Sequence, residues 1–341
     1  MYDNFLPELG VTAACFIPIK NGFRLFYEHN HTIYSRNSLD MAKTFSEAVS
    51  LFDSPTNACV SALRVAPDKI LFARKRPLTE KIQKLGLGGA NHHLVQLNET
   101  TEELTDLGQI EAEEGCFYVM NDRLLQLKNG RIILPEAVHP KENYDKKLET
   151  AGLCGCSYSD DMGQTWKQSN WIAASNPNGH LAEPMVVEST DKLFMFMRNT
   201  TGYLHQSISL DNGETWQPET QTTIRMPCAP FCVKRDPFSG YMFIVWDHSF
   251  PAYPQHQFPR SPICLGIRRD DTGSWERIGE LDHDPDKSYG YPALFFTPTQ
   301  VVISYYQSPT RYFNPSNQQL KLKVLSRKEL TVQQTTTSPL F

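Results

Sequence analysis

Short apolar runs separated by polar turns recur along this chain. Examples such as Ile70–Lys75, Leu193–Met197 and Tyr241–Asp247 are rich in aromatic and β-branched residues, which favour strands. Asn-Gly pairs at 21–22 and 129–130 stand between such runs, and this dipeptide favours tight hairpin turns. The pattern predicts an all-β chain of antiparallel hairpins.

The predicted strands group into six meanders without an obvious linker between them, which cover residues 10–52, 58–110, 117–171, 183–216, 228–278 and 291–325. In the third meander we expect the first two strands at Asp122–Leu127 and Arg131–Val138. In the second we expect a long loop at 76–91 that holds a short helix at 79–85. The repetition predicts one domain spanning residues 1–341.

Two copies of the pattern Ser-x-Asp-x-Gly-x-Thr-Trp stand fifty residues apart, at Ser159–Trp166 and Ser209–Trp216. The pattern suits a tight turn, because Asp accepts backbone N–H groups, Gly takes a positive φ and Trp packs beneath the next strand. Reduced copies remain at 35–45, with Asp40 and Thr44, and at Asp271–Trp275. These motifs resemble the Asp boxes, or BNR repeats, of the sialidase (neuraminidase) superfamily.

The resemblance implies a six-bladed β-propeller of four-stranded antiparallel blades. A ring of blades must close, so we expect either the first ten residues or the tail 330–341 to supply the outer strand of the last blade. In a propeller, the starts of first strands and the ends of second strands converge on one face. The polar residues expected there are Asn121, Asp122, Arg123, Glu183, Arg198, Asp247, Arg260, Tyr289 and Tyr291.

Four residues match the order and approximate spacing of sialidase site residues. They are Glu183 in Glu183-Pro184, Arg198, Arg260 and Tyr291 in Tyr291-Pro292. By this resemblance the arginines bind a substrate carboxylate, Tyr291 attacks the anomeric carbon and Glu183 takes its proton. Either Tyr291 or Tyr289 could be the nucleophile, and Asp247 is a further candidate for contact with substrate.

The sequence departs from the sialidase pattern in two places. Phe16-Ile17-Pro18 stands where the family has Arg-Ile-Pro, so the first of three arginines is missing, and Arg123 or Arg76 could replace its charge. The aspartate that serves the family as acid has no clear counterpart, and Asp122, Glu28 or His31 could replace it.

Composition and charge limit the kinds of partner that the protein is expected to bind. The net charge of −5 and the lack of a basic run argue against nucleic acid, and no apolar run is long enough to cross a membrane. The eight cysteines contain no Cys-x-x-Cys pair and the histidines are scattered, so we expect neither metal nor cofactor. The N-terminus lacks the features of a secretory signal, which favours a cytoplasmic protein, although a secreted protein trimmed of its leader would look the same.

Three classes of function remain open at this point. The first is an exo-acting, retaining sialidase-like glycosidase that acts on a terminal acidic sugar. The second is a polysaccharide lyase or a glycosidase of other specificity on the same scaffold. The third is a non-catalytic, carbohydrate-binding propeller. In each case the partner is a carbohydrate, and the oligomeric state is not defined by the sequence.

Overall fold

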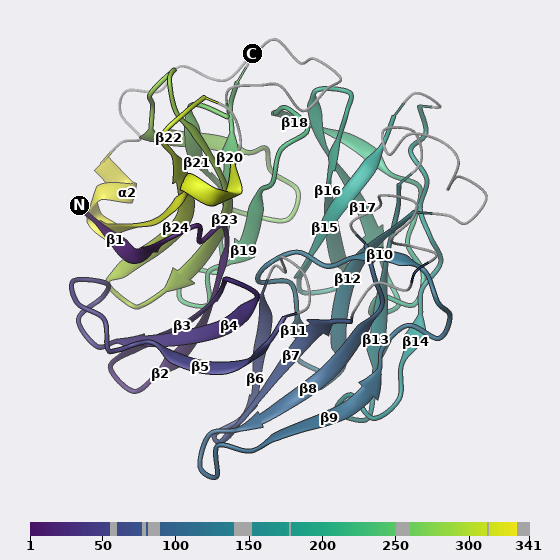
Figure 1. The fold of residues 1–341 in the computed structure, drawn as a ribbon. Coiled ribbons are helices and arrows are strands. Elements are labelled where there is room, and N and C mark those ends of the chain that lie inside the picture. The colour runs from purple at the N-terminus through teal and green to yellow at the C-terminus, as the bar shows by residue number, and fades with distance from the viewer. Residues whose placement is uncertain are drawn as a thin grey trace.

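The computed structural model describes residues 1–54, 60–76, 80, 89–139, 152–176, 179–249, 260–311 and 314–332. Within these residues the chain forms six antiparallel sheets, arranged like blades around a central axis (Figure 1). Each sheet has four strands in series, and the third carries one additional short strand. The predicted all-β, six-bladed propeller is confirmed.

In the first three blades the strand order in space follows the sequence. Blade one contains β2 (Ala14–Ile19), β3 (Gly22–His29), β4 (Thr32–Ser38) and β5 (Val49–Asp53). Blade two contains β6 (Ser61–Ala66), β7 (Lys69–Lys75), β8 (His92–Asn98) and β9 (Leu104–Gln109). Blade three contains β10 (Cys116–Tyr118), β11 (Leu125–Gln126), β12 (Ile132–His139), β13 (Leu153–Ser159) and β14 (Lys167–Gln168).

The last three blades follow the same plan, except that blade six takes its outer strand from the start of the chain. Blade four contains β15 (Leu181–Glu188), β16 (Leu193–Asn199), β17 (Tyr203–Ser209) and β18 (Thr220–Arg225). Blade five contains β19 (Cys232–Arg235), β20 (Met242–Asp247), β21 (Ile263–Arg268) and β22 (Glu276–Asp282). Blade six contains β23 (Ser288–Phe296), β24 (Gln300–Ser308), β25 (Gln319–Ser326) and β1 (Tyr2–Leu9).

Two short helices accompany the last blade, the 3₁₀ helix η3 (Pro315–Asn317) and the α-helix α2 (Arg327–Val332). No helix in the described ranges has the length and apolar character needed to span a bilayer.

The N-terminal strand closes the ring. Strand β1 pairs antiparallel with β25, with Tyr2 opposite Val324 and Phe5 opposite Lys321. Leu6 is fully buried in the apolar cluster of this blade, and Lys321 pairs with Asp3 at 2.7 Å. Of the two closures that the sequence allowed, the structure therefore uses the N-terminal residues.

Apolar side chains fill the spaces between neighbouring blades. One continuous cluster runs across blades four, five and six. Within it Phe196 of β16 packs edge-to-face against Trp275, with ring centroids 5.7 Å apart. Because strands in the middle of each blade are covered on both faces, they read as continuous apolar runs, as in the fully buried β20.

The first strand of blade three corrects the sequence-based prediction. The predicted strand Asp122–Leu127 is replaced by two short pieces, β10 and β11, and residues 119–124 between them are not in a strand. Asp122 adopts a φ of 61°, which breaks the extended ladder at this point. The helix predicted at 79–85 falls almost wholly outside the described residues and stays a prediction.

The two complete Asp boxes form the expected turns. Thr165 donates to Asp161 through both its backbone N–H (2.8 Å) and its hydroxyl (2.5 Å), and Gly163 has a φ of 89°. The second box repeats these bonds between Thr215 and Asp211. The first box follows β13, and Gly152, directly before the other end of that strand, lines the cavity described below, so this box lies on the opposite side of the propeller. The second box follows the corresponding strand of blade four, β17.

The reduced boxes behave differently from each other. In blade one Asp40 still accepts the backbone N–H (2.9 Å) and hydroxyl (2.7 Å) of Thr44. In blade five the turn is organised by Asp270, which accepts the N–H of Thr272 at 2.8 Å. Asp271, which the motif pointed to, instead pairs with Arg235 at 2.6 Å. Asp270 precedes Trp275 by the same number of residues as Asp161 precedes Trp166, so the shift by one residue keeps the spacing of the full box.

Replacing Asp161 by Ala should destabilise the propeller by about 1–2 kcal/mol at neutral pH. The hydrogen bonds from Thr165 lower the pKa of Asp161 to about 2, below the value near 4 of an unfolded aspartate. The stabilisation is therefore complete above about pH 4 and is lost as the pH falls toward 2.

Urea unfolding at pH 7 and pH 3 measures this effect, and the gap between wild type and Asp161→Ala should be smaller at pH 3. Asp160→Ala is the matched control, because the Asp160 side chain is half exposed and pairs with Arg131 on the surface. An equal loss in both variants would contradict the assignment.

Candidate active site

A cavity of about 280 Å³ opens where blades two, three, four and six meet. Its polar lining comes from strand ends of these blades: Lys75, His92, Tyr118, His139, His180, Glu183, Arg198 and Tyr291. Its apolar lining includes Phe117, Val119, Met120, Ala137 and Leu181. A mostly apolar hollow with a few converging polar groups is typical of a small-molecule site.

The propeller topology explains why these residues meet. Lys75, His139 and Arg198 end, or nearly end, the second strands of blades two, three and four. Glu183 and Tyr291 stand near the beginning of the first strands of blades four and six. Of the residues expected on one face from the sequence, the structure brings Glu183, Arg198 and Tyr291 to this cavity.

Glu183 and Arg198 form an ion pair at the wall of the cavity. Arg198 Nη1 lies 2.9 Å from Glu183 Oε1, and both side chains are about one-tenth exposed. The other carboxylate oxygen, Oε2, is buried and has no hydrogen-bond partner among the described residues. Glu183 therefore keeps one oxygen able to accept a proton.

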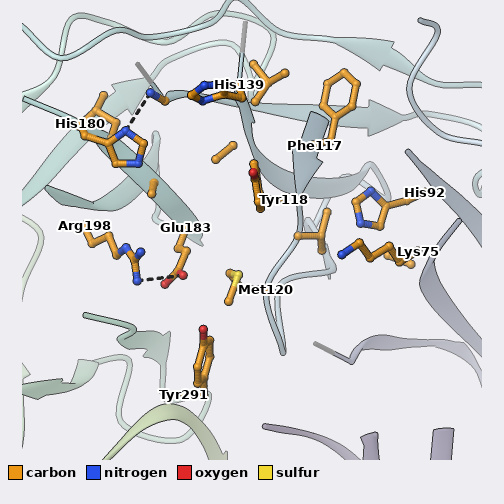
Figure 2. A pocket seen from close by; sticks show the side chains of 17 residues that line it. Lys75, His92, Phe117, Tyr118, Met120, His139, His180, Glu183, Arg198 and Tyr291 are labelled. Carbon is orange, nitrogen blue, oxygen red and sulfur yellow. Dashed lines mark hydrogen bonds and ion pairs between the residues drawn. The ribbon is translucent and has the colours of Figure 1, made fainter. Parts of the chain in front are cut away.

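Tyr291 completes this group from blade six. Figure 2 shows its hydroxyl directed toward Glu183 and Arg198. Its ring is half-buried and packs against Tyr306, with centroids 6.0 Å apart.

Glu183 and Tyr291 share an unusual backbone. Their φ values are 51° and 49°, and each stands at a register shift in its strand, directly before a proline. An L-residue with positive φ in a strand is rare, and a bulge re-aims the side chain relative to a regular strand. The bulges explain how two residues near strand starts come to face the cavity.

Arg260 lies close to the same group, although it is not among the described residues that line the cavity. Its Nη1 donates to Tyr306 Oη at 2.9 Å. Burial lowers the pKa of Arg260, but the neighbouring acidic groups of Tyr306, Tyr291 and Asp247 outweigh it and raise the pKa overall. Burial likewise lowers the pKa of Arg198, and Glu183 and Tyr291 raise it overall. Both arginines therefore stay charged next to the hydroxyl of Tyr291.

Asp247 and Tyr289 are not among the described residues that line the cavity. Asp247 is fully buried, and burial raises its pKa well above its usual range although nearby Arg260 lowers it. Tyr289 is 2% exposed and packs edge-to-face against Tyr305 in the core. The packing of Tyr289 favours Tyr291 as the tyrosine available to a ligand.

Asp122 contacts residues of other blades and is not among the described residues that line the cavity. Its Oδ2 is 2.6 Å from Nζ of Lys234, and its Oδ1 accepts from the thiol of Cys15 at 3.3 Å. It thus connects blades one, three and five. These contacts give Asp122 a structural role, whereas the sequence suggested an acid.

The two arginines offered as substitutes for the missing cation lie elsewhere. Arg123 is 2% exposed, and its guanidinium donates to the carbonyl oxygens of Asn121 (2.9 Å) and Phe231 (3.2 Å). Arg76 is exposed and donates to Gln109 Oε1 at 3.1 Å, on the outer side of blade two. Neither belongs to the described lining of the cavity.

Blade one contributes no described residue to the lining. Phe16 is buried and packs edge-to-face against Phe23 at 5.0 Å, so an apolar ring fills the position of the family's first arginine. Glu28 accepts the backbone N–H of His31 at 2.6 Å, and burial raises its pKa. Neither Glu28 nor His31 reaches the described lining of the cavity.

Several lining residues were missed by the sequence reading: Lys75, His92, Tyr118, His139 and His180. The histidines are scattered in sequence, which favoured ordinary surface or hydrogen-bonded roles. The signal was present in the topology, because Lys75 and His139 end second strands as Arg198 does. His180 is oriented by the N–H of Gly152, which donates to Nδ1 at 2.9 Å.

The sequence profile of the BNR repeat-like domain matches residues 113–303, more than half of the chain. The chain therefore belongs to the BNR repeat-like family, and its fold is that of the sialidase superfamily. No curated protein sequence matches it significantly.

Solved structures with the same fold include several sialidases. The chain superposes on Trypanosoma rangeli sialidase with a TM-score of 0.69 at 12% identity, over 96% of this chain and 56% of that one. On the Hadza microbial sialidase Hz136 it superposes with a TM-score of 0.68 at 13% identity, over 93% of this chain and 66% of that one. On a Dyadobacter fermentans protein of unknown function it superposes with a TM-score of 0.67 at 18% identity, over 95% of this chain and 98% of that one. The chain thus spans little more than half of the trypanosomal sialidase.

Replacing Asp122 by Asn should lower stability by up to about 3 kcal/mol, because it leaves the ammonium of Lys234 without its buried counter-charge. The ligand affinity of the folded fraction should stay within twofold of wild type. Thermal unfolding and ligand titration check this. A loss of turnover at unchanged stability would instead restore Asp122 as a catalytic acid.

Proposed function

We propose that this protein is an exo-acting glycoside hydrolase of the sialidase type, which releases a terminal acidic sugar with retention of configuration. The observation that carries the proposal is the group formed by Glu183, Arg198 and Tyr291 in one cavity (Figure 2). The unpartnered Oε2 of Glu183 and the direction of the Tyr291 hydroxyl suit a base and a nucleophile.

The chemistry follows from the charges around Tyr291. A free tyrosine has a pKa near 10 and is a weak nucleophile at neutral pH. Glu183 can take the phenolic proton as Tyr291 Oη bonds to the anomeric carbon and the bond to the leaving oxygen breaks. The leaving oxygen departs with the electron pair of its bond and takes a proton from solvent water. Water then attacks the anomeric carbon and gives a proton back to solvent, the bond to Tyr291 breaks, and the tyrosine oxygen recovers its proton from Glu183.

Two arginines support this step. Arg198 and Arg260 both interact with the charge on Tyr291, so they stabilise the phenolate that develops during attack. Guanidinium groups also match the planar geometry of a carboxylate. A neutral tyrosine suits a sugar whose anomeric carbon bears a carboxylate, because an Asp or Glu nucleophile would be repelled by it.

The solved structures support the substrate class without deciding it. One describes Trypanosoma rangeli sialidase in complex with sialic acid, and another its covalent intermediate with 2,3-difluorosialic acid. At 13% identity these structures share the fold with this chain. The acidic sugar is therefore our inference from the arginines and the tyrosine.

A non-catalytic, carbohydrate-binding propeller is the second candidate. It is favoured by Phe16, which is apolar where the family carries its first arginine. The positions of Asp122, Glu28 and His31 outside the described cavity lining point the same way, because they leave the acid unassigned. A protein that binds acidic sugars and turns over none of them would have this function.

Tyr291→Phe should abolish turnover of an aryl glycoside of sialic acid, whose leaving group departs without an acid, while affinity stays within about threefold. In wild type a 2,3-difluorinated acidic sugar should label Tyr291, as peptide mass spectrometry would detect. Tyr289→Phe is the matched control and should keep activity. Full activity in Tyr291→Phe would overturn the assignment of the nucleophile.

Arg260→Ala should weaken binding of a carboxylate sugar at least tenfold, because each charge-assisted hydrogen bond contributes about 1.5–3 kcal/mol. Calorimetry should show a similar loss for Arg198→Ala. Arg76→Ala removes an exposed cation that donates to Gln109, away from Tyr291, and should have no effect. If both Arg198→Ala and Arg260→Ala bind as wild type does, the carboxylate is held elsewhere.

A further inference from the structure

The cavity has a second polar end that the proposed mechanism does not use. Lys75 ends β7 and His92 begins β8, and the two are direct register partners in blade two. Both line the cavity, on the opposite side from Arg198 and Glu183 (Figure 2). The antiparallel ladder therefore places two nitrogen-bearing side chains together at this end.

A buried carboxylate fixes the ring of His92. Nδ1 lies 2.7 Å from Glu111 Oε1, and the backbone N–H of His92 donates to Oε2 at 2.7 Å. Asn91 Nδ2 approaches the same oxygen at 3.3 Å, and His92 and Glu111 are 3% and 1% exposed. With Nδ1 held by Glu111, the other nitrogen, Nε2, remains for the cavity.

Nε2 of His92 makes no hydrogen bond to any residue within the described ranges, and it is not sealed from the cavity. Because Glu111 keeps the proton on Nδ1, a second proton on Nε2 makes the ring an imidazolium that donates to a ligand oxygen. The carboxylate behind the ring balances that charge.

Glu136 of β12 completes the support. It is fully buried, and burial together with the neighbouring charge of Glu111 raises its pKa well above the usual range. The raised pKa favours the neutral form of Glu136, and its Oε1 accepts the N–H of Ser157 at 3.1 Å. Lys75 brings a second nitrogen-bearing group to this end of the cavity, beside His92.

We propose that Lys75 and His92 form a second anion-binding subsite, which takes a carboxylate, sulfate or phosphate group on the part of the ligand remote from Tyr291. Among the described lining residues Glu183 is the single acidic side chain, and it lies at the other end. The apolar walls of Phe117 and Val119 strengthen the attraction by excluding water. The subsite rests on the proposed function only in that Arg198 and Arg260 hold the ligand's other end.

Inorganic sulfate tests the subsite without a sugar or turnover. Imidazole NMR signals of wild type, assigned with His92→Gln, should show a saturable shift of His92 on titration with sodium sulfate at constant ionic strength. Lys75→Gln should raise the apparent Kd of this shift at least tenfold.

The neighbouring histidine provides the matched control. His93 is the next residue on β8 and also pairs with a carboxylate, Asp106, at 2.7 Å, but it is outside the cavity lining. His93→Gln should leave the sulfate response of His92 unchanged. A His92 signal that ignores sulfate, or one that responds equally in wild type and Lys75→Gln, would overturn the proposal.

Calorimetry with a matched pair of sugars separates this proposal from the glycosidase. The two ligands are an acidic sugar with one carboxylate and the same sugar carrying an additional sulfate ester. Wild type should bind the sulfated sugar at least tenfold more tightly. Lys75→Gln and His92→Gln should remove this preference and leave the affinity for the unsulfated sugar within twofold.

Affinity and turnover, measured together, distinguish the anion-binding subsite from the glycosidase activity. Preference for the sulfated sugar without turnover of either ligand would retain the subsite and refute the hydrolase. Turnover with equal affinity for both sugars would retain the hydrolase and refute the subsite.

Discussion

Closure of the ring is the constraint on which the arrangement of the site depends. The pairing of β1 with β25 joins the first residues of the chain to its last blade. Only a closed ring fixes the angle between blades, and the cavity takes its walls from four of them. Tyr291, on the blade that β1 completes, would otherwise have no defined position relative to Glu183. The apolar burial of Leu6 and the ion pairs of Asp3 therefore contribute indirectly to the geometry of the site.

The sequence was sufficient to predict those features of the fold that repeat along the chain. The meanders and the two Asp boxes predicted the six blades, since turn chemistry and alternating runs are local properties. Topology then placed Glu183, Arg198 and Tyr291 on one face, and the structure brings these three into one cavity. The surroundings of Asp122 could not be predicted in this way, because its contact with Lys234 accompanies a φ of 61° that no local pattern signals.

The histidines illustrate a different limit. His92, His139 and His180 are far apart in sequence, and each belongs to a different pair of strands. Their shared position becomes evident only when strand ends are treated as equivalent across blades. The partner of His92 is harder to predict from the sequence, because Glu111 follows β9, the outer strand of its blade, and outer strands usually face solvent. A buried glutamate at such a position is revealed by its contacts and not by its place in a periodic pattern.

The left-handed backbone of Glu183 and Tyr291 has a consequence for how this protein would respond to selection for heat resistance. Positive φ at a residue other than glycine costs on the order of 1–3 kcal/mol, and the prolines that follow make relaxation harder. Glycine would relieve that strain at either position but would remove the carboxylate or the phenol. A screen that selected for thermal tolerance alone would therefore tend to recover glycine at positions 183 and 291. The selected variants would be more stable propellers whose cavity lacks the carboxylate and the phenol.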